Sequence, residues 1–124
     1  MANEKSKKFE ELLDNVQNLK NLIAYQNGSV VSRSILKKES GNITLFAFDK
    51  GEGLSEHTSP YDAMVYLCDG EAEIKISGNI YSISEGNIII MPAKEPHALK
   101  AVSKFKMLLI MLKSWVFAWI YYWK

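Results

Sequence analysis

The stretch from Gly51 to His97 decides the fold of this chain and reads GEGLSEHTSPYDAMVYLCDG followed by EAEIKISGNIYSISEGNIIIMPAKEPH. It holds both histidines, all three prolines and most of the glycines of the 124 residues. Turn residues divide it into short runs rich in Val, Ile and Tyr, which is typical of antiparallel strands joined by tight connections. We therefore expect the chemistry of the protein to lie in this stretch.

The dipeptide Asp69-Gly70 predicts a hairpin, because Asp-Gly readily adopts the positive φ angles of a type I′ turn. Strands are expected on either side of it, at residues 64–68 and 71–77. In the second strand Ala72, Ile74 and Ile76 share one face, which predicts one buried and one solvated side. Further strands are predicted at residues 30–36, 43–48, 80–83, 88–91, 98–102 and 105–112. About eight strands at regular spacing indicate an all-β sandwich or barrel.

The N-terminal residues predict one amphipathic α-helix over residues 6–24. Apolar side chains recur there at helical spacing, at Phe9, Leu12, Leu13, Val16, Leu19 and Ile23. The polar face mixes both signs of charge and lacks the basic bias of membrane-surface helices. We therefore expect this helix to pack on the β-domain.

The composition excludes several classes of protein. Hydrophobic residues make up 48% and charged residues 23%, as in a single folded, soluble domain. A formal net charge of +1 gives no broad positive field, so nucleic acid is not expected as a partner. Cys68 is the only cysteine, and we expect a structural thiol in a reducing, cytoplasmic setting.

Two motifs in the central stretch resemble those of the cupin superfamily, whose members are jelly-roll β-barrels. The first motif places a glycine, two histidines, a glutamate and a second glycine at fixed intervals, and Gly51, His57 and Gly70 match it. The second motif places a glycine, a proline and a histidine, and Gly86, Pro92 and His97 match it. The resemblance covers about residues 43–112. It implies a cupin-type jelly-roll β-barrel, here with one N-terminal amphipathic α-helix.

The resemblance also implies where a metal would bind, since cupins hold iron, manganese, nickel or zinc with three histidines and a glutamate. In this chain Ser59 stands at the position of the second histidine and Ala63 at that of the glutamate. Two imidazoles alone bind such metals weakly. Asp62 could complete a site with His57 and His97 only if the strand were bulged, because a shift of one residue turns a side chain to the opposite face.

Three interpretations of His57 and His97 follow. They are neutral pocket residues left from a lost metal site, a ligand pair completed by Asp62 or water, or acid–base groups that act without a metal. Strand alternation adds candidates for the barrel interior: Phe46, Phe48, Met64, Tyr66, Met91, Phe105, Met107, Leu109 and Met111. We predict a ligand-binding set of His57, Ser59, Tyr66, Phe46, Phe48, Met91 and His97, and we assign no catalytic residue.

Residues 114–124 read SWVFAWIYYWK and hold all three tryptophans. The apolar run that they extend is shorter than the roughly 20 residues of a membrane span and is interrupted by Lys113, so we do not expect a membrane partner. Three interpretations of this aromatic tail stay open: packing on the barrel or across a dimer, an extension without a selected role, and an anchor at a membrane interface.

The chain is thus expected to divide into an N-terminal helix within residues 1–28, a barrel over residues 29–113 and a tail over residues 114–124. The function that we predict is the binding of a small molecule in the barrel, with a depleted metal site. The alternatives are a cupin enzyme, either an oxygenase or isomerase that uses a metal at His57 and His97 or an isomerase without metal, and a structural or interaction module. Small cupins commonly pair, so a homodimer is expected.

Overall fold

The computed structural model describes residues 10–113, so the predicted aromatic tail lies outside the described residues. Within this range the chain is mostly β-structure. A single 3-10 helix, η1, covers Leu19–Leu22, and no helix of the described residues is long and apolar enough to cross a membrane. The described strands are β1 (Val30–Lys38), β2 (Gly41–Phe48), β3 (Gly53–His57), β4 (Tyr61–Ile76), β5 (Asn79–Ser84), β6 (Ile88–Met91), β7 (His97–Lys100) and β8 (Phe105–Lys113).

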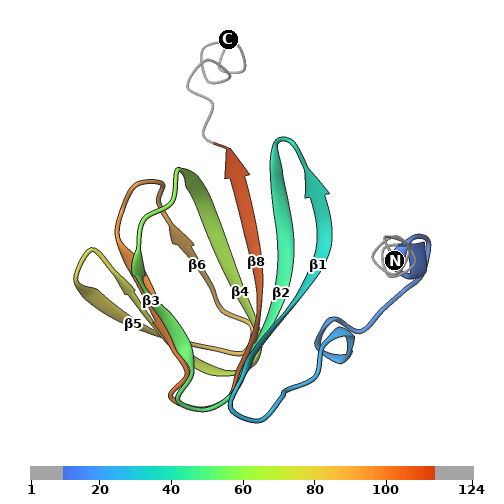
Figure 1. Ribbon diagram of the computed structural model, residues 1–124, viewed down its shortest axis with the longest axis horizontal. Coiled ribbons are helices and arrows are strands. Elements are labelled where there is room, and N and C mark those ends of the chain that lie inside the picture. Colours follow the sequence, from blue (N-terminus) through green and yellow to red (C-terminus); the bar gives the residue numbers. More distant parts are fainter. Residues whose placement is uncertain (1–9, 114–124) are drawn as a thin grey trace.

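The strands form one curled antiparallel sheet, which confirms the all-β, jelly-roll prediction (Figure 1). The hydrogen-bonded order is β1-β2-β8-β4-β7-β3, with β5 and β6 also paired to β4. The first half of β4 pairs with β6 and β8, and its second half pairs with β5 and β7. This one long strand therefore joins the two walls that enclose the core.

The predicted hairpin at Asp69-Gly70 is wrong, because β4 continues through both residues. The pairing of β4 with β8 has a bulge between Leu67 and Asp69. Gly70 has the positive φ of 77° that the turn prediction required, but this φ bends β4 from one wall to the other and does not form a turn. A Cβ at Gly70 would collide with the carbonyl oxygen of Lys104, so the two backbones approach too closely for any side chain. The hairpin turn lies at Ser77 and Gly78, where φ is 48° and 85°.

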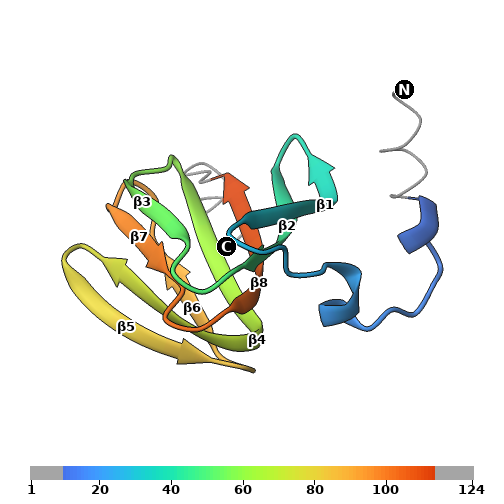
Figure 2. The same cartoon turned by 60° about the horizontal axis from the view of Figure 1, so that its bottom comes forward.

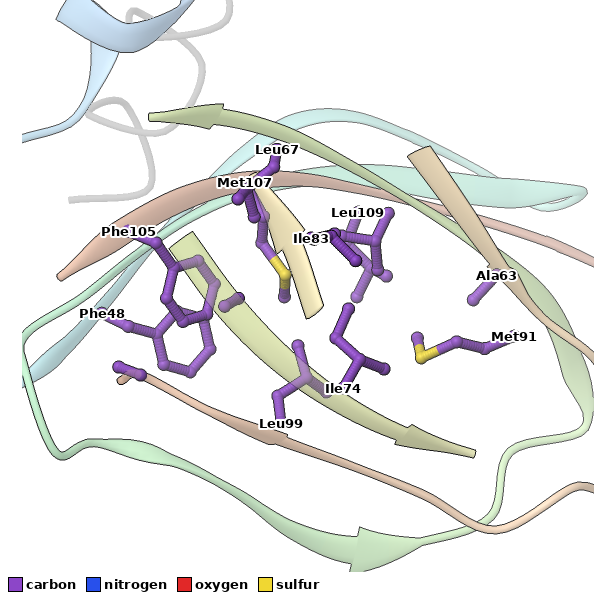
Figure 3. Packing of buried hydrophobic residues seen from close by; sticks show 13 residues of the cluster. Phe48, Ala63, Leu67, Ile74, Ile83, Met91, Leu99, Phe105, Met107 and Leu109 are labelled. Atoms are coloured by element: carbon purple, nitrogen blue, oxygen red, sulfur yellow. The ribbon is translucent and has the colours of Figure 1, made fainter. Parts of the chain in front are cut away.

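The core lies between the two walls (Figure 3). Phe48 and Phe105 stack at one end of it, with ring centroids 4.5 Å apart and planes 10° apart. Ala63 and Met91 lie at the other end in Figure 3 and pair across β4 and β6. Predicted interior residues that the structure places in this core are Phe48, Met91, Phe105, Met107 and Leu109, with Phe46 and Met111 packed against it.

Tyr66 and Met64 were predicted inside the barrel and are not there. Ala63, Val65 and Leu67 of β4 face the core, so the residues between them face outwards. Tyr66 packs instead in a second, outer cluster around Ile23, Leu45, Ala47 and Cys68. This cluster explains why β2 is apolar on both faces, since its outer face is covered by the N-terminal segment.

The predicted N-terminal helix ends well before residue 24. Helical backbone covers residues 10–12 and then stops, since Asp14 has a φ of 57° and the Asn15 side-chain amide donates to the carbonyl of Glu11. The chain resumes helical geometry only in η1. The last apolar residues of the predicted helix, Leu19 and Ile23, do pack on the barrel.

Candidate functional site

His57 and His97 lie side by side, although strands β4, β5 and β6 separate them in the sequence. His57 ends β3 and His97 begins β7, and the two residues pair directly across these strands. Their ring centroids are 4.4 Å apart and their planes meet at 70°, an edge-to-face arrangement. The two motifs, which the resemblance assigns to one metal site, thus bring their histidines together.

The backbone fixes the tautomer of both rings. Nδ1 of His57 lies 2.7 Å from the carbonyl oxygen of Ser55, and Nδ1 of His97 lies 3.2 Å from that of Glu95. Since a carbonyl oxygen can only accept, each Nδ1 carries the proton and donates. The Nε2 atom of each neutral ring is then left as a hydrogen-bond acceptor.

The two rings differ in exposure. His97 is buried, with 5% of its surface exposed, whereas His57 is exposed. Burial lowers the pKa of His97 below its ordinary value, the contact with the Glu95 carbonyl opposes this, and the neighbouring His57 lowers the pKa further. His97 is therefore largely neutral at pH 7.

Asp62, the predicted third ligand, and the two residues at the missing ligand positions do not complete a metal site. Ser59 Oγ accepts a hydrogen bond of 3.1 Å from the amide of Tyr61. Asp62 is exposed, and its Oδ1 accepts a hydrogen bond of 2.9 Å from the amide of Ala93. Ala63, at the glutamate position, is the residue that faces the core.

These donors do not fit a resident metal. Among residues 10–113 no group of three or more His, Cys, Asp or Glu side chains could hold a metal ion. Two imidazoles remain, without the carboxylate or third imidazole that first-row metal sites in proteins normally use. Asp62 accepts its hydrogen bond from the amide of Ala93 and forms no metal-binding group with the two histidines.

The apolar interior of the barrel is formed partly by residues that were predicted and partly by residues that were missed. Phe46 and Met91 face inwards as expected, whereas Phe48 is fully buried in the stack with Phe105. Ile76, predicted on the buried face of its strand, packs against the core. Leu54 and Ile89 also pack against it and were missed. The alternation of buried and exposed positions along β6 was the signal that could have found Ile89.

The comparisons with known proteins agree with this fold. The family model for the cupin domain matches residues 44–113, more than half of the chain. A conserved protein of unknown function from Streptococcus pyogenes is 39% identical with a TM-score of 0.79, and the match covers 83% of this chain and 90% of that one. A cupin 2 conserved barrel domain protein from Leptotrichia buccalis is 38% identical with a TM-score of 0.76, and the match covers 78% of this chain but only 47% of that one.

A cupin superfamily protein from Desulfitobacterium hafniense is 28% identical with a TM-score of 0.78, and the match covers 82% of this chain and 93% of that one. No curated protein matches the chain. The family match rests on the barrel itself, including both segments that carry His57 and His97. The chain therefore belongs to the cupin superfamily.

Proposed function

We propose that the barrel binds a small, mostly apolar molecule that donates a hydrogen bond to the imidazoles of His57 and His97, without help from a resident metal. The observation that carries this proposal is the pair of contacting rings whose Nδ1 atoms are both engaged by backbone carbonyls. Such a pair presents hydrogen-bond acceptors in a fixed orientation, which is how a pocket selects the polar end of a ligand.

The surroundings favour an apolar body for this ligand. Phe46 and Met111 pack at the margin of a core that contains no charged side chain. A hydroxyl or amide N–H of the ligand would satisfy Nε2 of the buried ring, whereas an apolar analogue would leave that acceptor unpaired. Discrimination between the two kinds of ligand is thus expected from His97 above all.

The enzyme alternatives have less support. A metal-dependent oxygenase or isomerase needs more ligands than the two histidines supply. An acid–base isomerase needs a group that adjusts the basicity of its histidine, and both Nδ1 atoms contact neutral carbonyl oxygens and no carboxylate. Binding without turnover is therefore the function that we propose.

We also propose that the protein works as a homodimer in the reducing interior of the cell. Cys68 supports the second part, because it is a buried free thiol whose pKa is raised, chiefly by burial. Such a thiol is protonated and unreactive at neutral pH. The dimer is supported by β1, which among the described residues pairs only with β2 and so leaves one backbone edge without a strand partner.

The test is a titration with phenol and cyclohexanol, and with their methyl ethers, which have the same body but no hydroxyl proton. Binding is followed by the ¹⁵N resonances of the histidine rings at pH 7.5. We expect the hydroxyl compounds to shift the Nε2 resonances of both histidines and to bind at least tenfold more tightly than the ethers, which corresponds to about 1.4 kcal/mol. Equal affinity of alcohols and ethers would refute hydrogen bonding by the imidazoles.

Two variants localise the binding. His97→Ala removes the buried acceptor and is expected to abolish the preference for hydroxyl compounds. Tyr66→Phe is the matched control, because Tyr66 was a predicted ligand-binding residue that lies in the outer cluster. If Tyr66→Phe weakens binding as much as His97→Ala does, the ligand is not in the barrel.

A further inference from the structure

The outer face of the sheet carries a row of apolar side chains that crosses three neighbouring strands. Met64 of β4 pairs with Ile90 of β6 on one side and with Ile110 of β8 on the other. Residues that pair directly across neighbouring strands point to the same face of a sheet. Since the adjacent Ala63 faces the core, Met64 and its two partners point outwards.

Two further apolar residues extend this row into a patch. Leu112 lies two residues beyond Ile110 on β8, and Ile88 lies two residues before Ile90 on β6, so both also point outwards. Ile88, Ile90 and Leu112 are 57%, 59% and 56% exposed. The outer patch is the name used below for five residues: Met64, Ile88, Ile90, Ile110 and Leu112. Apolar side chains gathered on one face in this way mark a surface that packs against something.

The N-terminal segment covers the neighbouring part of the same face but not the outer patch. Tyr66 and Leu108, which pair across β4 and β8, pack in the cluster that contains Ile23. Among residues 10–113 no member of the outer patch packs in this cluster or in the core. Figures 1 and 2 both show the N-terminal segment on the β1 side of the sheet, away from β6. The outer patch therefore has no cover among the described residues.

The chain itself supplies an apolar segment that begins at the rim of the outer patch. β8 ends at Lys113, directly after Leu112, so the aromatic tail over residues 114–124 starts beside the patch. Nine of the eleven tail residues are apolar or aromatic, the exceptions being Ser114 and Lys124. Each aromatic side chain buries about 150–250 Å² when it packs. The tail thus offers the kind of surface that the outer patch needs.

The tail is also long enough to cover the patch. Ile90 lies two strands away from Leu112 and two residues along them, a distance of about 12 Å. Eleven extended residues span up to about 36 Å, which leaves room for a chain reversal after Lys113. A segment tethered this close to its site has an effective concentration on the order of millimolar. This proximity favours the tail over a free partner.

We propose that the aromatic tail of each chain folds back over its own sheet and packs on the outer patch. The tail crosses β8, β4 and β6 at Ile110, Met64 and Ile90, next to the area that the N-terminal segment covers. The two ends of the chain together then cover the outer face of β4 and β8. This inference goes beyond the ligand of the barrel and rests neither on that ligand nor on the proposed dimer, since the free edge of β1 stays outside the contact.

Tryptophan fluorescence of the full-length protein tests this proposal, because all three tryptophans are in the tail, at Trp115, Trp119 and Trp123. We expect emission at shorter wavelengths than that of N-acetyltryptophanamide in the same buffer, and weaker quenching by acrylamide. Unfolding in urea is expected to remove both differences. Emission and quenching in native protein that equal those of the model compound would overturn the packing of the tail.

Two double variants locate the contact. Ile90→Lys with Leu112→Lys places charges in the outer patch at positions that are already exposed, so the fold is expected to survive, which circular dichroism verifies. Since burial of one isoleucine or leucine changes an equilibrium constant by about tenfold or more, we expect the tail to dock about a hundredfold more weakly. The emission should move to longer wavelengths and the quenching by acrylamide should increase.

Ile80→Lys with Val102→Lys is the matched control. Ile80 is 63% exposed on β5, and Val102 is 51% exposed between β7 and β8, so both lie outside the outer patch. This variant is expected to leave tryptophan emission unchanged. If the patch variant emits like wild type, or if both variants change the emission equally, the outer patch is not the site of the tail and the proposal is overturned.

Dilution and vesicles distinguish the other occupants. Packing within one chain predicts emission that does not depend on protein concentration, including concentrations at which sedimentation velocity finds monomer. A shift to longer wavelengths on dilution would assign the tail to a second copy and overturn the proposal. Vesicles of phosphatidylcholine and phosphatidylglycerol are expected to leave the emission unchanged. A shift to shorter wavelengths that needs vesicles would make the tail a membrane anchor and would also overturn it.

Discussion

The substitution Gly70→Ala tests the most consequential difference between sequence and structure. If Asp69-Gly70 were the turn of a hairpin, an added methyl group would point into open space. In the structure Gly70 lies inside β4, and a Cβ would collide with the backbone carbonyl of Lys104. The substitution therefore measures how closely β4 and the start of β8 approach.

The expected loss has two parts. Placing Ala at a φ of 77° costs about 1–2 kcal/mol. The obstructing atom belongs to the backbone, so either β4 or the loop before Phe105 must shift, and overpacking of this kind typically costs a further 1–3 kcal/mol. We expect Gly70→Ala to lower the free energy of unfolding by about 2–5 kcal/mol in total.

Gly78→Ala is the matched control for the backbone part. Its φ is 85°, and nothing lies within 4 Å of the position of its Cβ. Urea unfolding followed by circular dichroism gives both free energies, and we expect Gly70→Ala to lose at least about 1 kcal/mol more than Gly78→Ala. Equal losses would show that the close approach at Gly70 does not exist in solution.

Three further predictions concern the surface and the site. Tyr25→Phe removes the hydroxyl that donates a 2.6 Å hydrogen bond to Asp69, and urea unfolding is expected to show a loss of about 1 kcal/mol. The pKa of His97 is lowered in the folded protein, so as the pH drops below the ordinary value of 6.5 the unfolded chain binds a proton at this histidine before the folded protein does, and the free energy of unfolding should fall. His97→Gln should make the free energy of unfolding, measured with urea, depend less on pH in this range. Ser59→His combined with Ala63→Glu restores the missing ligand types, and isothermal titration with Co²⁺ is expected to show a site that wild type lacks; no gain in affinity would mean that these positions do not face the histidines.

The parts of the fold that depend on local alternation could be predicted from the sequence. Residues 43–48 read as a strand with two apolar faces, and the structure covers both faces. His57 and His97 were expected in one pocket because each belongs to a motif, and the pairing of β3 with β7 places them in contact. Here local pattern and tertiary structure agree.

The errors arose where one local signal supports two structures. A positive φ at Gly70 serves a hairpin turn or a bulged bend equally well, and only the contact with the loop at Lys104 decides between them. Whether Tyr66 faces the core depends on which alternate residues of β4 face inwards. Ala63 stands at the glutamate position of the first cupin motif and faces the core, which would have placed Tyr66 on the outer face. The groove of about 1100 Å³ between β1 and residues 22–26 was not predictable, since no local pattern shows how the segment before β1 folds back beside that strand.

Helical spacing was likewise insufficient at the N-terminus. The apolar residues of segment 6–24 share one face of an ideal helix, but the side chain of Asn15 bonds the backbone of Glu11 and the helix ends near Asp14. Asn and Asp compete with the helix for backbone hydrogen bonds in this way.

The most direct test of the central claim is the metal content of untagged protein purified without chelators. We propose that His57 and His97 serve a ligand and not a resident metal, because Ala63 occupies the glutamate position and Asp62 accepts a hydrogen bond from the amide of Ala93. Elemental mass spectrometry is expected to find far less than one equivalent of iron, manganese, nickel or zinc, with no difference between wild type and His57→Ala. A full equivalent of one metal, lost in both His57→Ala and His97→Ala, would contradict it.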